Sequence, residues 1–437
     1  MTSIDLLINA RWIVPVVPEN RIFKDCAIAV HQGQILAILP QEEAAKRYIT
    51  TTIENLNEHI LTPGLINAHG HAAMTLFRGF ADDQPLNDWL NNHIWPAEKQ
   101  WVDEQFVRDG TELAIAEMIK SGTTCFADMY FFPEQTAQAA LDANMRCQIY
   151  FTIFDFPCAW GSGPEDYFAK GLTLHDTFRE NDLINIGFGP HAPYTVGDET
   201  LKKVAVLAQE MDTPIHIHLH ETAQEIEDSI QQYGARPIQR LMNLGLLSPL
   251  TQCVHMTQIN ESDIAILQQT GAHVIHCPES NLKLASGFCP VDRLLNAGIN
   301  VALGTDGAAS NNDLDLFSEL KTAALLAKAV SGNAAALNSD SALRMATLNG
   351  AKALGIDHLV GSLEEGKQAD IIAIKLSDLD LQPLYNPLSQ LVYTNVGHRV
   401  SHAWVKGKCL MQNRELLTIN ERELKSKVRY WQEKIQS

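Results

Sequence analysis

The chain has 437 residues, of which 46% are hydrophobic and 19% charged, a balance typical of globular proteins. Its net charge of −19 disfavours nucleic acids and anionic membrane surfaces as partners, because both carry negative charge. No apolar run approaches the roughly 20 residues of a membrane span, and the N-terminus "MTSIDLLINARWIVPV" lacks the basic start of a signal peptide. This length suits one large barrel-type domain and one smaller domain.

The beginning of the chain, to about residue 60, reads as short strands separated by turn residues. From Gly64 onward, short apolar strands alternate with segments of helical spacing, and eight such strands fall between Gly64 and Asp306. A repeated strand-then-helix order is the signature of a parallel β/α architecture, and the count predicts an α/β fold of the (β/α)8, TIM-like barrel type over residues 61–360.

A β-type pattern returns after about residue 360, in "GSLEEGKQADIIAIKL" and "VSHAWVKGKCLMQ". These strands are too few to stand alone. We therefore expect residues 1–60 and 361–437 to form one small β-sandwich domain, built from both chain ends, beside the barrel.

The eight cysteines are scattered, and no two have C-x-x-C or zinc-finger spacing. Cys125, Cys253 and Cys277 lie in apolar runs and are expected to be buried free thiols. Free thiols are typical of a reducing compartment, so a cytoplasmic location is expected.

The stretch "PIHIHLHE" places three histidines on one face of a predicted strand, because side chains at i, i+2 and i+4 share a face. His216, His218 and His220 are followed by Glu221. A solvated strand face usually carries Lys, Glu, Thr or Ser, whereas imidazole is the commonest metal ligand. Three histidines in register beside a glutamate favour a functional site.

Other predicted strands also end on histidine or aspartate, where barrel enzymes carry their catalytic groups. These strand-end residues are His69 and His71 in "NAHGH", His191 in "GPHAPY", His255 in "QCVHM", His276 in "VIHCP" and Asp306 in "LGTDG". His191 or His276 alone could be a core histidine bonded to the backbone. Together, the residues at one barrel mouth predict a catalytic divalent metal with an open position for water.

At these residues the chain resembles the amidohydrolase superfamily, and within it the 5-methylthioadenosine/S-adenosylhomocysteine deaminase family, a branch that also contains relatives of chlorohydrolases and guanine deaminases. The similar segments run nearly end to end: "LTPGLINAHGHAAMTLFRGFADDQPLNDWL", "HIWPAEK", "GTTCFADMY", "GPHAPYTV", "HLHET", "HCPESNLKLASG", "LGTDGAASNN" and "GSLEEGKQADI".

The resemblance implies four metal ligands: His69, His71, His218 and Asp306. The family's H-x-x-E motif selects His218 with the catalytic Glu221, although spacing alone does not exclude His220. His216 is interpreted as structural, and the roles of His220 and His276 stay open. No lysine ends a strand near His191, so a single metal is expected, most simply Zn2+, with Fe2+ or Mn2+ as alternatives.

The resemblance further implies hydrolytic deamination at C6 of a 6-aminopurine nucleoside. Glu221 is then the acid that protonates N1, Asp306 both a ligand and the base, and His255 the residue that orients the attacking hydroxide. His191 is expected to contact the purine and Glu98 in "WPAEK" the ribose, although Glu98 alone would be read as a solvated carboxylate. Glu221 and Asp306 thus also contact the substrate.

One stretch departs from relatives that take S-adenosylhomocysteine, whose arginines can clamp its carboxylate. The corresponding "QIYFTIFDFPCAWGSGPEDYF" holds no arginine, and Arg146 precedes it. Its Phe151, Phe154, Phe156 and Trp160 are expected to line a pocket suited to a thiomethyl group. The predicted substrate is therefore 5'-methylthioadenosine, with adenosine and S-adenosylhomocysteine as further candidates.

Two other functions stay open at this stage. The same metal site could serve an s-triazine, guanine or pterin hydrolase, or the chain could be a non-catalytic binding protein on an amidohydrolase barrel. The second is disfavoured because every expected site residue is present. The apolar mouth also suggests a homo-oligomer, a dimer or larger.

Overall fold

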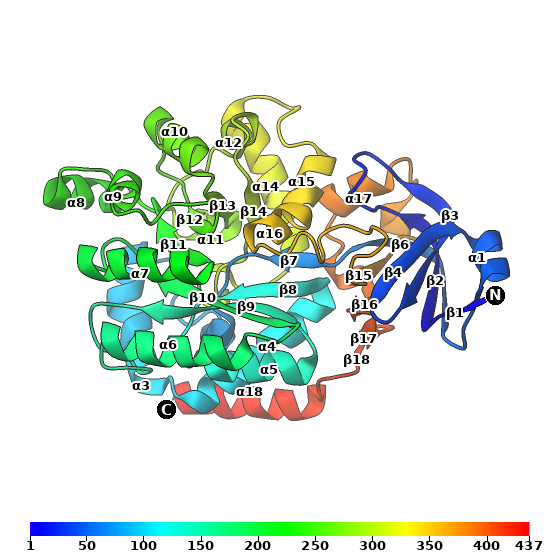
Figure 1. Ribbon diagram of the computed structural model, residues 1–437, viewed down its shortest axis with the longest axis horizontal. Helices are drawn as coiled ribbons and strands as arrows, with labels where there is room; N and C mark the ends of the chain where they lie inside the picture. The colour runs from blue at the N-terminus through cyan, green and yellow to red at the C-terminus, as the bar shows by residue number, and fades with distance from the viewer. Residues whose placement is uncertain (437) are drawn as a thin grey trace.

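The computed structural model describes residues 1–436 and consists of a parallel barrel and a mixed sheet beside it (Figure 1). Eight parallel strands, each paired with the next in chain order, form the barrel. They are β7 (Leu65–Asn67), β8 (Thr123–Asp128), β9 (Arg146–Ile153), β10 (Ile184–Pro190), β11 (Ile215–Leu219), β12 (Thr251–His255), β13 (His273–His276) and β14 (Val301–Leu303). The predicted (β/α)8 barrel is confirmed.

The first and last barrel strands meet through the backbone. The N–H of Ala68 donates to the carbonyl of Leu303 at 2.9 Å, and the N–H of Asp306 donates to the carbonyl of His69 at 3.1 Å. These two bonds close the barrel just where both strands end. The strands are buried along nearly their whole length, as expected when helices cover one face and barrel interior lies on the other.

Helices surround the barrel, and local sequence explains several of their ends. Asp103 caps α4 by accepting from the N–H of Phe106, and Asn260 with Asp263 forms a capping box at α10. The main covering helices are α4 (Glu104–Ser121), α5 (Pro133–Ala143), α6 (Pro164–Phe178), α7 (Asp198–Met211), α8 (Ala223–Tyr233), α9 (Pro237–Asn243), α10 (Glu261–Thr270), α12 (Val291–Asn296), α14 (Leu316–Ser331), α15 (Ser339–Met345) and α16 (Leu348–Ala353).

Shorter helical segments follow the ends of the first, seventh and eighth barrel strands. They are η1 (Ala72–Phe77), α2 (Leu86–Asp88), η2 (Trp89–Ile94) and α3 (Trp95–Trp101) after β7, α11 (Pro278–Lys283) after β13, and α13 (Ala308–Asn311) after β14. These segments stand at the mouth where the candidate site residues gather.

The second unit is one continuous eight-stranded mixed sheet in the order β18-β17-β16-β15-β6-β2-β3-β4. Its strands are β2 (Leu6–Ile13), β3 (Phe23–His31), β4 (Gln34–Pro40), β6 (Ile53–Pro63), β15 (Ile371–Lys375), β16 (Val400–Val405), β17 (Lys408–Gln412) and β18 (Glu415–Leu416). The antiparallel pair of β6 and β15 joins the two halves, so the sheet is built from both chain ends as predicted. A separate two-stranded pair consists of β1 (Thr2–Ser3) and β5 (Tyr48–Ile49). Helix α1 (Gln41–Arg47) contacts β5 and the strands β3 and β4 of the mixed sheet.

Part of the C-terminal range assigned to this domain instead covers the barrel. Helix α17 (Pro387–Tyr393) contacts α14 and α15, and α18 (Glu421–Gln436) contacts α4. The buried Trp431 of α18 donates its indole N–H to Asp109 at 3.0 Å. The remaining short segments are η3 (Leu379–Leu381) and η4 (Gly397–Arg399). The domain boundaries near residues 60 and 360 stay a prediction.

Two further sequence expectations concern the whole chain. All eight cysteines are free, and Cys125, Cys253 and Cys277 are buried as expected. Among residues 1–436, no helix is long and apolar enough to cross a membrane.

A buried ion pair fastens the barrel to the sheet. Arg146 begins β9 and donates from Nε to Asp370 at 3.1 Å and from a terminal nitrogen to the carbonyl of Asp182 at 3.0 Å. Asp370 also accepts the N–H of Lys406 at 2.7 Å. Arg146 and Asp370 are both about 4% exposed, so neither charge is solvated if its partner is removed.

We expect Arg146→Leu to lower the free energy of unfolding by about 3–5 kcal/mol, because it leaves the Asp370 carboxylate buried without its ion-pair partner. Chemical denaturation measures the change. Arg179→Leu is the matched control, since Arg179 is 65% exposed and should shift stability by less than about 0.5 kcal/mol. Equal effects of the two substitutions would contradict a structural role for the buried pair.

Candidate active site

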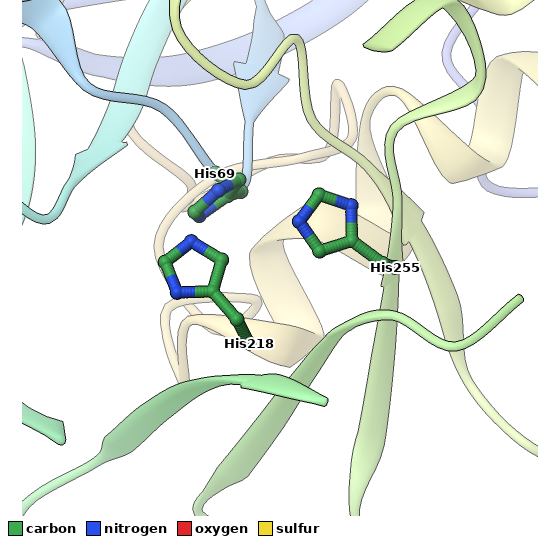
Figure 2. Close-up of side chains that lie close together, drawn as sticks. All are labelled: His69, His218 and His255. Atoms are coloured by element: carbon green, nitrogen blue, oxygen red, sulfur yellow. The ribbon is translucent and has the colours of Figure 1, made fainter. Parts of the chain in front are cut away.

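Histidines from three barrel strands face one another at the C-terminal mouth. His69 follows β7, His218 lies in β11 and His255 ends β12, and one ring nitrogen from each lies within 4.8 Å of the others (Figure 2). His69 also belongs to a second group of this size with His71 and Asp306. The two groups share His69, so five potential ligands surround one small volume.

Hydrogen bonds on the outer side of three of these rings fix their orientation. The Nδ1–H groups of His71 and His218 donate to the carbonyls of Met129 at 2.6 Å and of His191 at 2.7 Å. His255 donates from Nδ1 to the side-chain oxygen of Asn281 at 2.9 Å. Such bonds leave each Nε2 as the nitrogen that faces the cluster, the arrangement found around metal-binding histidines.

The fourth histidine of the cluster, His69, shows the clearest sign of a missing partner. Its Nδ1 pairs with Nε2 of His216 at 2.7 Å, while its own Nε2 is buried with no hydrogen-bond partner. Buried polar atoms are nearly always paired, so an orphan nitrogen among other donors fits a bound cation. A mixed set of imidazole nitrogens and a carboxylate suits Zn2+, Fe2+ or Mn2+.

Asp306 is held as a carboxylate at the edge of this cluster. Its Oδ1 lies 3.4 Å from Nε2 of His69 and 3.2 Å from Nε2 of His71. The Ser280 and Ser310 hydroxyls donate to its Oδ2 at 2.6 and 3.1 Å. Burial opposes ionisation, but the imidazoles of His69 and His71 beside it hold the pKa of Asp306 well below its usual range.

Strained backbone marks the strand ends that carry these groups. His220, His255 and Asp306 have φ values of 55°, 75° and 61°, in the left-handed region that side-chain-bearing residues rarely adopt. Each such residue costs on the order of 1–3 kcal/mol and persists where the surroundings enforce it. The left-handed conformation turns the backbone away from the strand direction at each of these residues.

The three histidines of "PIHIHLHE" have different surroundings. His218 faces the cluster, whereas His216 lies deeper, stacked on Tyr150 and bonded to His69. His220 does not line the catalytic cavity: its Nδ1–H donates to the carbonyl of Gln258 at 3.1 Å and its Nε2 accepts from the N–H of Ile238 at 3.0 Å. The alternation rule would place His220 beside His218, but its left-handed backbone breaks the alternation.

His276, the other residue with an open role, is buried and does not line the catalytic cavity. Burial and the nearby charge of His255 lower its pKa to about 3, so its ring is neutral.

Glu221 lies next to the cluster, with Oε2 3.8 Å from Nε2 of His255. Burial raises its pKa, and the charge of Asp306 adds to this effect. Its backbone is fixed by Glu225, whose carboxylate accepts the N–H groups of His220 at 2.9 Å and of Glu221 at 2.8 Å. Thr257 donates to the carbonyl of Glu221 at 2.7 Å.

Glu225 is a site residue that sequence reasoning missed. The available signal was the Thr222-x-x-Glu225 spacing of a helix N-terminus, and Thr222 does cap α8. The carboxylate of Glu225, however, binds the two residues before the cap. That longer reach depends on the tight turn at His220, which the sequence pattern does not reveal.

A cavity opens onto the catalytic cluster. Its polar wall carries Glu221, Asp306 and His191, and Glu98 lies on the wall formed by α3. Its apolar wall carries Met74, Leu86, Trp89, Leu90, Ile94, Trp95, Met129, Phe131, Phe154 and Leu284. The histidines and carboxyl residues proposed from the sequence for metal binding, catalysis or substrate contact all line this cavity, except the fully buried His69.

The two predicted substrate residues have well-defined partners. Glu98 is buried and accepts a hydrogen bond from the hydroxyl of Tyr130 at 2.7 Å. Burial raises the pKa of Glu98 to about 7, against the lowering effect of that hydrogen bond. Burial lowers the pKa of His191 to about 3, so this ring is neutral at pH 7, and its Nδ1 lies 3.1 Å from the hydroxyl of Thr195.

The expected aromatic lining from residues 151–160 is only partly correct. Phe154 lines the cavity, and Phe156 stacks on it while remaining 42% exposed. Phe151 and Trp160 are buried in the core instead, where Phe151 packs against Phe188. Much of the apolar wall comes from residues 86–95, whose helical segments had not been assigned a role.

The comparison with known families agrees with this geometry. The sequence profile of the amidohydrolase family matches residues 60–410. The chain belongs to this family. The match covers the whole barrel together with the β15 and β16 strands of the accompanying sheet.

Relatives of this amidohydrolase are similar over their full length. One from Saccharophagus degradans is 60% identical over 436 residues, covering 100% of this chain and 98% of the relative. Another from Syntrophobacter fumaroxidans is 43% identical, covering 98% of this chain and 97% of the relative. Both are named 5-methylthioadenosine/S-adenosylhomocysteine deaminase.

Solved structures give the same picture of the fold. An adenosine deaminase from Xanthomonas campestris with bound zinc superimposes with a TM-score of 0.98 at 48% identity, covering 100% of this chain and 99% of that one. Atrazine chlorohydrolase from Arthrobacter aurescens has a TM-score of 0.91 at 23% identity, covering 98% of this chain and 99% of that one. The second likeness shows a shared fold alone.

We expect His218→Ala to lose most of the bound divalent metal, because it removes one nitrogen from a set whose other members are fixed in place. Elemental analysis of the purified protein measures the metal-to-protein ratio. His358→Ala, at an exposed position outside the catalytic cavity, is the control and should keep the wild-type ratio. Wild-type metal content in His218→Ala would contradict the ligand assignment.

Proposed function

We propose that this amidohydrolase hydrolyses the 6-amino group of a 6-aminopurine nucleoside, releasing ammonia and the 6-oxo product. The preferred substrate in this proposal is 5'-methylthioadenosine, which gives 5'-methylthioinosine, and adenosine and S-adenosylhomocysteine are further candidates. The observation that carries the proposal is the buried Glu98 in the wall of the catalytic cavity, because a ribose diol needs such an acceptor. The names of the relatives from Saccharophagus degradans and Syntrophobacter fumaroxidans support it.

We also propose that His69, His71, His218 and Asp306 hold a single divalent metal, with zinc preferred. The zinc in the Xanthomonas campestris structure supports this choice. A divalent metal at such a site polarises water and lowers its pKa. A ring nitrogen of His255 lies within 4.8 Å of those of His69 and His218, so position alone does not distinguish an orienting role from ligation.

Three side chains move or hold protons in this proposal. Glu221, whose burial raises its pKa and so favours the protonated form, donates to N1 of the purine and makes C6 electrophilic. Asp306, kept ionised, accepts the proton of the attacking water. His255, beside Glu221, directs the water oxygen at C6. A proton then passes to the amino group, and ammonia leaves as the carbonyl forms.

Two residues and the apolar wall position the substrate. The neutral His191 faces the purine, while Glu98 in its ionised form accepts hydrogen bonds from the ribose hydroxyls. Leu86, Leu90 and Trp95 provide apolar surface for a 5'-thiomethyl group. In this proposal, contacts at both ends of the nucleoside hold C6 at the acid and base.

The rival functions differ in what they need from Glu98. An s-triazine, guanine or pterin has no ribose, so a hydrolase for these compounds has no use for a buried diol acceptor. A non-catalytic binding protein would release no ammonia from any substrate.

The direct test is to measure ammonia release from the zinc-loaded protein with 5'-methylthioadenosine, adenosine, S-adenosylhomocysteine and guanine. We expect turnover of the first two nucleosides at kcat/KM of at least about 10⁴ M⁻¹s⁻¹, a value ordinary for enzymes, and little with guanine. Hydrolysis of guanine or a triazine without nucleoside turnover would replace the proposal by its first rival. No hydrolysis at all would favour the second.

We expect Glu98→Gln to raise the KM for adenosine about tenfold or more while changing the rate with free adenine little, because only the nucleoside uses the diol acceptor. In the wild type, KM should fall as pH rises through about 7, where Glu98 ionises. Glu98→Gln should lose that dependence. Steady-state kinetics between pH 5.5 and 8.5 measure both effects, and equal losses for adenine and adenosine would contradict ribose binding.

A further inference from the structure

His69 differs from the other histidines of the catalytic cluster in its outer hydrogen-bond partner. The outer partners of His71 and His218 are backbone carbonyls, which only accept hydrogen bonds, so each of these rings carries a proton on Nδ1. The partner of His69 is Nε2 of His216, at 2.7 Å, and an imidazole nitrogen can either donate or accept. The tautomer of His69 therefore depends on the tautomer of His216.

A buried glutamine determines where His216 carries its proton. Strand register places Gln252 of β12 directly beside His216 of β11, and both side chains are buried. Nε2 of Gln252 donates to the carbonyl of Ala353 in α16 at 2.6 Å. Because a carbonyl only accepts, the amide nitrogen has to face Ala353, and the amide oxygen has to face the imidazole. That oxygen lies 3.1 Å from Nδ1 of His216, so Nδ1 carries the proton.

The position of this proton decides the direction of the next hydrogen bond. His216 contacts His69, Gln252 and the ring of Tyr150, and none of these groups is an anion that could offset a buried imidazolium. The ring is therefore neutral and has a single N–H. With that N–H on Nδ1, Nε2 of His216 accepts and Nδ1 of His69 donates. The lone pair of His69 is then on Nε2, the buried nitrogen that faces the other candidate ligands.

Packing holds the intermediate ring of this chain in place. The rings of His216 and Tyr150 stack with centroids 4.4 Å apart and an angle of 18° between their planes. Both residues are at most 1% exposed. A turn of the His216 ring that exchanged its two nitrogens would break both hydrogen bonds in a site that water does not reach. The chain thus connects a carbonyl of α16 to the catalytic cluster through fixed groups.

We propose that Gln252 is a positioning residue for the metal site. Through His216 it holds the proton of His69 on Nδ1, so that Nε2 can bind a divalent cation without a prior change of tautomer. This inference rests on the proposed metal site and deepens it, but it does not depend on which substrate the enzyme hydrolyses.

Removal of the amide oxygen should favour the opposite arrangement. The Nδ1–H of His216 would then be buried without an acceptor, which is costly, and the ring would shift toward the tautomer that carries its proton on Nε2. His69 would have to accept that hydrogen at Nδ1, and its own proton would move to Nε2, where the metal is expected to bind. Binding of the cation would first have to reverse both tautomers, so affinity should fall.

The test measures the zinc dissociation constant by competition with a chromophoric chelator. Gln252→Met keeps nearly the volume of glutamine but removes the amide oxygen. Gln252→Glu, in its protonated form, can still accept from His216 while donating to Ala353. His216→Phe keeps an aromatic ring on Tyr150 but removes both nitrogens. Gln148→Met is the matched control, because Gln148 is also a buried barrel glutamine and its amide atoms have no hydrogen-bond partner within residues 1–436.

We expect Gln252→Met to raise the zinc dissociation constant about tenfold and His216→Phe about tenfold or more, within the range typical of groups that orient metal ligands. Gln252→Glu should stay within about threefold of the wild type and Gln148→Met within about twofold. In the His216→Phe background, Gln252→Met should add less than about twofold, because the two residues act through one chain.

A role of Gln252 in packing alone predicts a different pattern. Methionine would then be tolerated better than a buried glutamate, and the effects of Gln252→Met and His216→Phe would add. Either result would overturn the inference, as would equal effects of Gln252→Met and Gln148→Met.

Nitrogen NMR of the zinc-loaded wild type, labelled in its histidine side chains, supplies a test that needs no folded Gln252 variant. His216, assigned by its absence from His216→Phe, should be protonated on Nδ1 and not on Nε2. A proton on Nε2 would overturn the inference. Failure of the proposed metal site looks different, because then the wild type itself does not retain zinc against the chelator.

Discussion

Closure of the barrel between its first and last strands is the constraint on which the site depends. The bond from Ala68 to Leu303 and the bond from Asp306 to His69 bring together residues more than 230 positions apart. Without that closure His69 and Asp306 would be ends of separate strands. With it, an acid and several imidazoles occupy one small buried volume where charges interact more strongly than in water.

The same closed barrel explains why neighbouring groups of the same type have different protonation states. Burial raises the pKa of Glu98 and, together with the charge of Asp306, that of Glu221, whereas the two histidines beside Asp306 keep that carboxylate ionised. His191, buried near other histidines, is neutral. Carboxyl groups that favour the protonated form and one that stays ionised thus differ in burial and in neighbouring charge, not in side-chain chemistry.

Much of this could be predicted from the sequence, because strand periodicity and the strand-end rule are local properties. They located the barrel strands and placed Glu221, His255 and Asp306 at one mouth. They failed where a residue leaves regular geometry or acts over a distance. His220 turns away from its expected face because its backbone is left-handed, and Glu225 binds backbone groups behind its own helix cap. The apolar wall from residues 86–95 and the docking of α18 on the barrel depend on tertiary packing that no local pattern contains.

The junction between the two units has a consequence for synthesis of the chain. Strand β6 ends at Pro63 and β7 begins at Leu65, so a single glycine separates the mixed sheet from the barrel, and a side chain on Gly64 would collide with Thr124. One edge of β6 pairs with β2, but its other edge pairs with β15, which is made some 300 residues later. Until the ribosome has released β15, that edge carries unpaired backbone groups beside the first barrel strand. Pairing of the strand that leads into the active site is therefore completed only after most of the chain has been made.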